Sequence, residues 1–214
     1  MLPAIKICGI STTDALDAAI EARADYIGFV FFPPSPRHVD GHAASALAMR
    51  AGADIGRVGL FVDADDGLIS EGLKAGRLDA LQLHGKETPQ RVAEVRSRFG
   101  TPVWKAISVA TAGDMETAEA YRGAADLLLF DAKTPSDAAL PGGMGLRFDW
   151  SLLERWKGRP GWGLAGGLTP DNVVDAIALT HPPLIDTSSG VESAPGVKDP
   201  GRIRAFCKAA RPAS

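Results

Sequence analysis

The stretch Ala4-Ile5-Lys6-Ile7-Cys8-Gly9-Ile10-Ser11-Thr12 decides the fold of this 214-residue chain. A short run of β-branched and apolar residues leads into a turn, and an Ala-rich stretch with helical spacing begins at Thr12. In a doubly wound open sheet, this first turn would normally carry a glycine-rich phosphate loop. The turn Gly9-Ile10-Ser11-Thr12 is not that fingerprint, so the unit favours a closed parallel barrel.

The same strand–loop–helix unit recurs along the whole chain. Strands are expected at Ala4–Cys8, Asp25–Val30, Arg57–Val62, Ala80–Leu83, Val103–Ile107, Asp126–Asp131, Gly161–Ala165 and Leu184–Thr187. Helices are expected at Thr12–Ala22, Ala43–Ala51, Gly67–Ala75, Pro89–Arg98, Ala112–Tyr121, Ser151–Trp156, Pro170–Leu179 and Pro200–Ala210. Eight alternating units of about 27 residues predict a single (β/α)8 TIM barrel of the α/β class. No linker divides the chain, so we expect one catalytic domain over residues 1–214.

Composition excludes several classes of protein. Hydrophobic residues make up 45% and charged residues 23% of the chain, as in soluble globular proteins. The net charge of -3 offers no basic excess for nucleic acid or an anionic membrane. The N-terminal apolar run is too short for a secretory segment, so we expect a cytoplasmic protein whose cysteines, Cys8 and Cys207, stay reduced. The four histidines lack metal-ligand spacing and no dinucleotide or Walker motif is present, so we expect neither metal nor cofactor.

The active site of such a barrel lies at the carboxyl ends of its strands. Cys8 ends the first strand, two residues after Lys6 on the same strand face, and a nearby ammonium favours the thiolate that can act as a base. An isolated cysteine is more often a small buried hydrophobe, which is the alternative for Cys8. Asp131 ends the sixth strand after an apolar run, and is either a general acid or a loop cap.

Three further side chains lie at predicted strand ends. Arg37 follows a proline-rich loop and is either a surface cation or a fork that binds a substrate carboxylate. Asp186 either lines the site or only orders the following loop. His84 is a candidate site residue, although a structural loop histidine is the commoner case.

The loops after strands seven and eight carry the clearest ligand signal. They contain Gly166-Gly167 and Ser188-Ser189-Gly190. Glycines let backbone N–H groups approach an anion, and serine hydroxyls add donors. Because barrels of this kind often bind phosphate with these two loops, we expect a phosphate site here rather than a pair of tight turns.

Taken in order, these segments resemble the phosphoribosylanthranilate isomerase family. The matching segments are Lys6-Ile7-Cys8-Gly9, Gly28-Phe29-Val30-Phe31-Phe32, Ser35-Pro36-Arg37, Val58-Gly59-Leu60-Phe61-Val62, Leu81-Gln82-Leu83-His84-Gly85, Gly142-Gly143, Phe148-Asp149-Trp150, Ala165-Gly166-Gly167-Leu168 and Ser188-Ser189-Gly190-Val191-Glu192. Thr187 departs from the usual Val of the family, and we expect this exchange to matter little.

The resemblance implies an activity and residue roles. The family converts N-(5-phosphoribosyl)anthranilate into 1-(2-carboxyphenylamino)-1-deoxyribulose 5-phosphate, an Amadori rearrangement in tryptophan biosynthesis (EC 5.3.1.24). Carried over by position, Asp131 would be the general acid and Cys8 the general base. Arg37 would face the anthranilate carboxylate, and His84 and Asp186 would line the site.

Two other interpretations remain open. One is a different phosphosugar barrel: an epimerase, an indole-glycerol-phosphate synthase or a dual-substrate isomerase. We expect such an enzyme to have a carboxylate or Lys at the position of Cys8. The other is a catalytically silent, phosphate-binding assembly subunit. The sequence leaves open whether the protein is a monomer or a homodimer.

Overall fold

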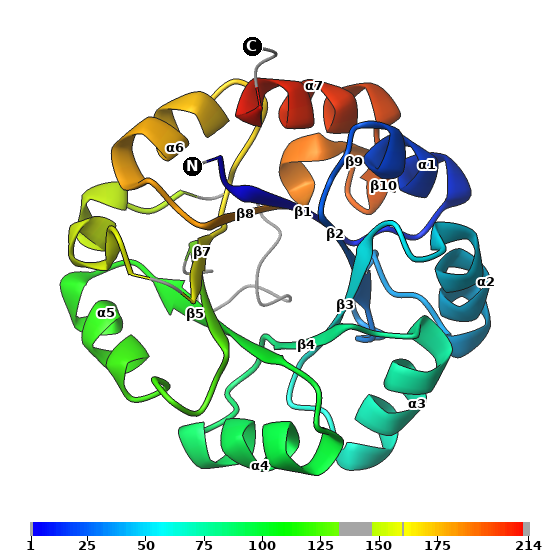
Figure 1. Ribbon diagram of the computed structural model, residues 1–214, viewed down its shortest axis with the longest axis horizontal. Helices are drawn as coiled ribbons and strands as arrows, with labels where there is room; N and C mark the ends of the chain where they lie inside the picture. Colours follow the sequence, from blue (N-terminus) through cyan, green and yellow to red (C-terminus); the bar gives the residue numbers. More distant parts are fainter. Residues whose placement is uncertain (1, 133–146, 160, 212–214) are drawn as a thin grey trace.

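The computed structural model describes residues 2–132, 147–159 and 161–211, and its eight parallel strands close into a barrel (Figure 1). The strands are β1 Ala4–Cys8, β2 Tyr26–Val30, β3 Gly56–Phe61, β4 Ala80–Leu83, β5 Val103–Val109, β6 Leu127–Ala132, β7 Trp162–Leu164 and β8 Leu184–Thr187. Each strand pairs with the next along the chain, and β8 pairs back onto β1. The predicted (β/α)8 barrel is confirmed.

Helices surround the barrel on all sides (Figure 1). They are α1 Thr13–Glu21, α2 Gly41–Ala51, α3 Asp66–Gly76, α4 Pro89–Phe99, α5 Ala112–Glu119, the 3-10 helix η1 Trp150–Trp156, α6 Val173–Thr180 and α7 Pro200–Ala210. A short 3-10 turn, η2 Ser189–Val191, and a hairpin of β9 Glu192–Ala194 and β10 Val197–Lys198 separate β8 from α7. None of the described helices has both the length and the apolar character needed to cross a membrane.

Two predicted helices differ from the observed elements. The segment expected as a helix at Ser151–Trp156 is a 3-10 helix. The helix expected from Pro170 begins instead at Val173, because the Asn172 carboxamide accepts a hydrogen bond from the Thr169 N–H at 2.9 Å and holds the preceding residues in a turn. Gly142 and Gly143, part of the family resemblance, lie outside the described residues.

The barrel interior is filled below the strand ends by a compact apolar layer. Alternate residues of a strand face the same side, so the residues two positions before the candidate site residues also point inward. Tyr26 and Trp104 meet there edge to face, with ring centroids 5.2 Å apart. The buried members of this layer are Val58, Ala80, Trp104, Leu129, Ala165 and Leu184. This apolar layer lies directly below the polar side chains of the candidate site.

The end of the barrel where strands begin is closed by a repeated aspartate pairing. An aspartate precedes each of β2, β4 and β6, and its N–H donates to the carbonyl of the first or second residue of the previous strand, at 2.8–2.9 Å. That residue's own N–H donates back to the aspartate carboxylate at 2.6–2.8 Å. The pairs are Ile5 with Asp25, Arg57 with Asp79 and Val103 with Asp126.

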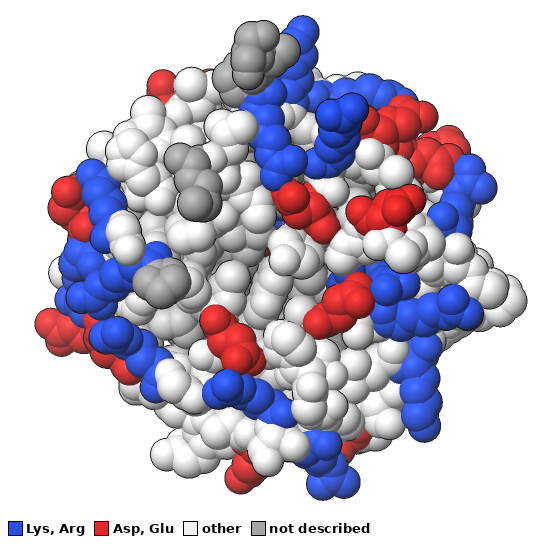
Figure 2. All heavy atoms as spheres, in the orientation of Figure 1, with Lys and Arg blue, Asp and Glu red and all other residues white. Residues whose placement is uncertain are grey.

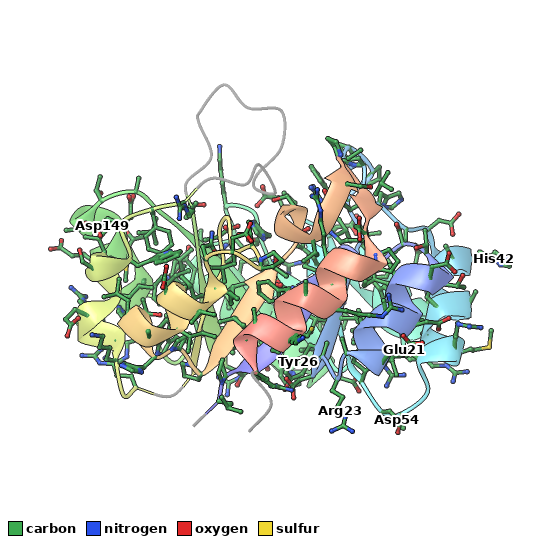
Figure 3. All side chains as sticks on the ribbon, turned by 90° about the horizontal axis from the view of Figure 1, so that it is seen from above. Glu21, Arg23, Tyr26, His42, Asp54 and Asp149 are labelled. Atoms are coloured by element: carbon green, nitrogen blue, oxygen red, sulfur yellow. The ribbon has the colours of Figure 1, made fainter. Side chains whose placement is uncertain are left out.

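Each of these carboxylates also contacts an arginine: Arg211, Arg57 and Arg96 respectively. Figure 2 shows acidic and basic side chains side by side around the centre of one face. In Figure 3, Tyr26, which begins β2, lies near Arg23 and Asp54 at one end of the barrel. The backbone N–H and carbonyl groups of Ile5, Arg57 and Val103 therefore all have hydrogen-bond partners.

Replacing Asp126 with Ala should lower the free energy of unfolding by about 1–3 kcal/mol, because the N–H of Val103 loses its acceptor. Activity of the folded variant should be unchanged, since this end of a barrel serves stability. Chemical denaturation measures the effect, with Asp54→Ala as a matched control at an exposed aspartate. Equal stability of the two variants would contradict the role given to the pairing.

Candidate active site

Strand β1 turns Lys6 and Cys8 into the barrel. Both are buried, and the Lys6 ammonium donates to Asp186 Oδ2 of β8 at 3.0 Å. The neighbouring position on β2 is Gly28, where a Cβ would lie 2.8 Å from Cys8 Sγ and 3.3 Å from Lys6 Cε. A side chain at this position would displace the thiol, so the glycine makes room for it.

Burial raises the pKa of the Cys8 thiol above its ordinary value, although Lys6 opposes the shift by charge and by a hydrogen bond. The sequence placed Lys6 on the same strand face as Cys8 and left open whether its ammonium influences the thiol. It did not show that burial outweighs that ammonium. For Lys6, burial favours the neutral amine, but the Asp186 carboxylate and the thiol leave its pKa above the ordinary value. Asp186 therefore favours the charged form of Lys6, whereas burial and the neighbouring ammonium groups act in opposite directions on the pKa of the Cys8 thiol.

Asp131 and His84 lie together at the ends of β6 and β4. His84 Nε2 is 3.3 Å from Asp131 Oδ2, and the backbone N–H of Ala132 donates to Asp131 Oδ1 at 2.8 Å. The carboxamide of Gln82 contacts His84 Nδ1 at 3.1 Å. Asp131 is thus a buried carboxyl held between a backbone donor and an oriented imidazole.

A buried ion pair outside the barrel holds the loop that carries His84. Lys105 Nζ of β5 lies 3.0 Å from Glu87 Oε2 and donates to the carbonyl of Gly85 at 2.8 Å. The N–H groups of Asp63 and Gly85 donate to the Glu87 carboxylate at 2.9 and 3.0 Å. Both charges are therefore compensated, and the turn after β4 has a fixed shape.

The loops after β7 and β8 are joined to each other at the barrel mouth. Thr187 Oγ1 donates to the Leu168 carbonyl at 2.7 Å, so the Thr expected to matter little has a defined role. A Cβ on Gly190 would lie 1.9 Å from the same carbonyl oxygen, which excludes any side chain there. Gly166 and Gly167 have φ angles of 84° and 64°, a region that favours glycine.

Backbone donors of these two loops are open to the mouth. Within the ranges 2–132, 147–159 and 161–211, the N–H groups of Gly166, Gly167, Ser188 and Ser189 donate no hydrogen bond to another described residue. All four residues are partly exposed. Backbone N–H groups without a protein acceptor on adjoining turns are a common feature of anion sites in proteins.

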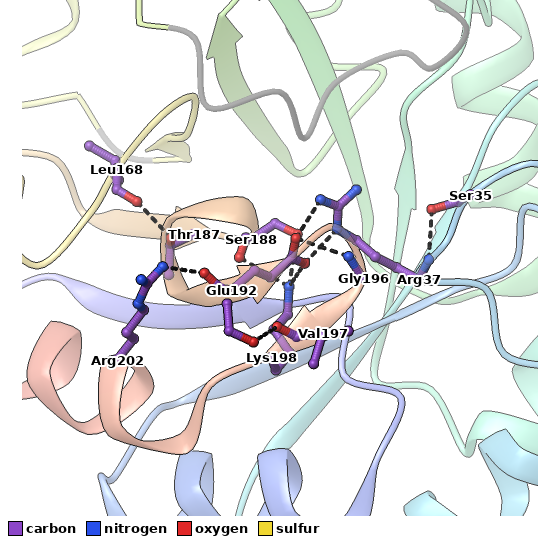
Figure 4. A network of polar contacts seen from close by, with 11 residues as sticks. Ser35, Arg37, Leu168, Thr187, Ser188, Glu192, Gly196, Val197, Lys198 and Arg202 are labelled. Carbon is purple, nitrogen blue, oxygen red and sulfur yellow. Dashed lines mark hydrogen bonds and ion pairs between the residues drawn. The ribbon is translucent and has the colours of Figure 1, made fainter.

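Arg37 is held by the hairpin that follows η2 (Figure 4). Its Nε and Nη2 donate to the two oxygens of Glu192 at 2.7 and 2.8 Å, in a bidentate pair. Lys198 Nζ lies 2.5 Å from Glu192 Oε1, so two cations share this carboxylate. The stem of Arg37 crosses Gly9, where a Cβ would lie 2.8 Å from Arg37 Cδ. Arg37 thus lies against the residue that follows Cys8.

The structure gathers the predicted residues at the carboxyl ends of the strands or on the loops that follow them. These residues are Cys8, Arg37, His84, Asp131, Gly166, Gly167, Asp186, Ser188, Ser189 and Gly190. Sequence reasoning missed the buried polar residues that support them, namely Gln82, Glu87, Lys105, Glu192 and Lys198. No group of three or more His, Cys, Asp or Glu side chains suited to a metal ion occurs among the described residues.

The fold and site define an enzyme of the isomerase class built on a (β/α)8 barrel. The family model for N-(5'-phosphoribosyl)anthranilate (PRA) isomerase matches residues 5–209, and the chain belongs to this family. The N-(5'-phosphoribosyl)anthranilate isomerase of Paramagnetospirillum magneticum is 55% identical over 207 residues, covering 97% of this chain and 96% of that protein. That of Paracoccus denitrificans is 54% identical, covering 96% of each.

Solved structures agree with these sequence relatives. The phosphoribosyl anthranilate isomerase of Thermotoga maritima is 36% identical, with a TM-score of 0.87 and 99% of both chains covered. A second structure of such an isomerase, in complex with reduced 1-(o-carboxyphenylamino)-1-deoxyribulose 5-phosphate, is 34% identical, with a TM-score of 0.85 and the same coverage.

The Cys8 thiol should titrate above its ordinary pKa of about 8.5 in the absence of substrate, because burial dominates its surroundings. In a Cys207→Ala variant, thiolate absorbance should appear only in alkaline solution, and Lys6→Met should move the midpoint higher. Tyrosine side chains also ionise in alkaline solution, so the absorbance of a Cys8→Ser, Cys207→Ala double variant is subtracted as the baseline. A midpoint below neutrality would show that the nearby ammonium groups outweigh burial.

Proposed function

We propose that this protein, acting as one catalytic barrel, converts N-(5-phosphoribosyl)anthranilate into 1-(2-carboxyphenylamino)-1-deoxyribulose 5-phosphate in tryptophan biosynthesis. The observation that carries the proposal is the joint arrangement of a buried thiol, a buried carboxyl and an open set of backbone donors at one barrel mouth. Membership of the isomerase family supports the choice of substrate.

Asp131 acts as the general acid in the first step. It gives a proton to the ribose ring oxygen as the C1–O bond breaks, and the nitrogen lone pair forms a Schiff base at C1. The contact with His84 orients this carboxyl, and the proximity of Gly166, whose Cβ would lie 2.9 Å from Asp131 Oδ1, sets it beside the phosphate loop.

Cys8 acts as the general base in the second step. Its thiolate takes the proton from C2, and the electron pair of that C–H bond moves to give an enolamine. Tautomerisation then gives the C2 ketone, with no net oxidation or reduction, so the steps need no redox cofactor. Lys6 beside the sulfur stabilises the thiolate when it forms.

The remaining site residues hold the two ends of the substrate. Arg37, oriented by Glu192, is turned toward the anthranilate carboxylate. The buried Oδ1 of Asp186 has no hydrogen-bond partner among the described residues and can accept one from a sugar hydroxyl. Gly166, Gly167, Ser188, Ser189 and Gly190 bind the phosphate through backbone and hydroxyl donors.

Cys8→Ala and Asp131→Asn should each lower turnover by roughly two to four orders of magnitude, the usual effect of losing one base or acid. Substrate binding should change much less, because neither change removes a principal anion contact. Loss of substrate fluorescence during turnover measures the rate. Near-normal turnover by either folded variant would overturn the mechanism.

Arg37→Ala should raise KM with a smaller effect on kcat, because a carboxylate contact made throughout the reaction contributes uniform binding. Glu192 keeps Lys198 as its partner, so the hairpin should hold its shape. Competitive inhibition by inorganic phosphate should persist in this variant. If phosphate inhibition disappeared together with substrate affinity, Arg37 would belong to the phosphate site instead.

A further inference from the structure

The carbonyl groups of the two phosphate loops are held from behind by three side chains. Asn172 Nδ2 donates to the Gly167 carbonyl at 2.9 Å, and Thr187 Oγ1 to that of Leu168 at 2.7 Å. Lys198 Nζ donates to the Ser188 carbonyl at 3.0 Å and lies 3.1 Å from Ser188 Oγ. The N–H groups of Gly167 and Ser188 in the same loops donate to no other described residue.

Lys198 differs from the other two because its side chain is an amine that can carry a charge. Burial lowers the pKa of this amine, and the Glu192 carboxylate opposes that shift. The Lys198 side chain is 1% exposed, and an ammonium withdrawn from water is costly unless anions compensate it. The Lys198 ammonium contacts the carboxylate of Glu192. The same carboxylate accepts hydrogen bonds from the Arg37 guanidinium. Among the described residues, the other hydrogen-bond partners of Lys198 are the carbonyl and hydroxyl oxygens of Ser188 (Figure 4).

We propose that Lys198 is a phosphate-positioning residue: from behind the Ser188 loop, it fixes the backbone donors and provides the buried positive charge that the substrate phosphate faces. The proposal rests on the phosphate site of the proposed function. Lys198 touches the loop and not the substrate, so its charge acts through the peptide groups that the phosphate contacts.

Arg37 and Lys198 both contact Glu192, and each acts on a different anionic end of the substrate. Arg37 serves the carboxylate, and Lys198 serves the phosphate through the loop. Removing the charge of Lys198 leaves Arg37 and Glu192 as a bidentate pair, so the carboxylate end should be little disturbed.

The test compares Lys198→Gln, which retains a hydrogen-bond donor without the charge, with Lys198→Arg, which retains the charge. Inorganic phosphate is the probe, used as a competitive inhibitor. In Lys198→Gln the inhibition constant of phosphate and the substrate KM should rise roughly tenfold or more, as expected for lost charge-assisted binding made throughout the reaction. Because the Lys198 ammonium also favours the Cys8 thiolate, kcat should fall as well, by a smaller factor than the rise in the inhibition constant. Lys198→Arg should retain most of the phosphate affinity. Lys208→Met, an exposed charge change on α7, is the control.

Two outcomes would overturn the proposal: wild-type phosphate inhibition in Lys198→Gln, or equal losses in the Gln and Arg variants, which would indicate a purely structural role. Should Lys198→Gln fail to fold, the side-chain ammonium resonance of Lys198 in the wild-type protein provides the second test. It should shift on addition of phosphate while that of Lys208 does not, and an unchanged Lys198 resonance would refute the role. If wild-type protein neither turns over the substrate nor binds phosphate, the proposed function itself fails.

Discussion

Closure of the barrel between β8 and β1 is the constraint on which the site depends. These strands lie at opposite ends of the chain, and their register sets Lys6 beside Asp186 across 180 residues of sequence. The two side chains form a buried ion pair at 3.0 Å. Such a pair contributes little net stability, because desolvation offsets its attraction, but a shift in register would leave two buried charges unpaired. The pair therefore favours the one register that holds Asp186 of β8 beside Lys6 of β1, and so near Cys8.

The functional side chains are fixed by groups that lie behind them. Lys105 and Glu87 shape the turn after β4 that presents His84, and His84 in turn contacts Asp131. Glu192 orients Arg37 from the hairpin after β8. These supporting residues are buried and hydrogen-bonded, so their geometry is set before a substrate arrives. Preorganised groups need no reorganisation during the reaction, which is the main electrostatic advantage of an enzyme site.

The sequence predicted the barrel because short β-branched or apolar runs alternate with stretches of helical spacing eight times, and this local pattern is sufficient to indicate the fold. It also predicted the residues at strand ends, since a parallel barrel brings all such ends to one mouth. It could not predict the buried ion pairs of Lys105 with Glu87 and of Glu192 with Lys198. In a sequence, a charged residue in a loop or on a strand is expected to be solvent-exposed, and its burial depends on contacts that only the folded structure shows.

Two other misses have local physical causes. The start of α6 was misjudged because Thr169-Pro170 is a strong helix-start signal, whereas the Asn172 side chain bonds both the Thr169 N–H and the Gly167 carbonyl and delays the helix. The ionisation of Cys8 could not be decided from the sequence, which shows a neighbouring charge but not the depth of burial that opposes it.

The backbone groups are hydrogen-bonded differently at the two ends of the barrel. One pattern serves stability, and the other serves function. Where strands begin, aspartate carboxylates accept from the backbone N–H groups of the neighbouring strands, so both groups of each pair are satisfied. Where strands β7 and β8 end, side chains instead donate to the loop carbonyls, and the N–H groups of Gly166, Gly167, Ser188 and Ser189 donate to no other described residue. An unsatisfied buried donor is costly, but a partly exposed one is hydrated and can exchange its water for an anion. We therefore expect substrate to bind at the carboxyl ends of the strands, where the loop carbonyls already have donors and the backbone N–H groups are available to an anion.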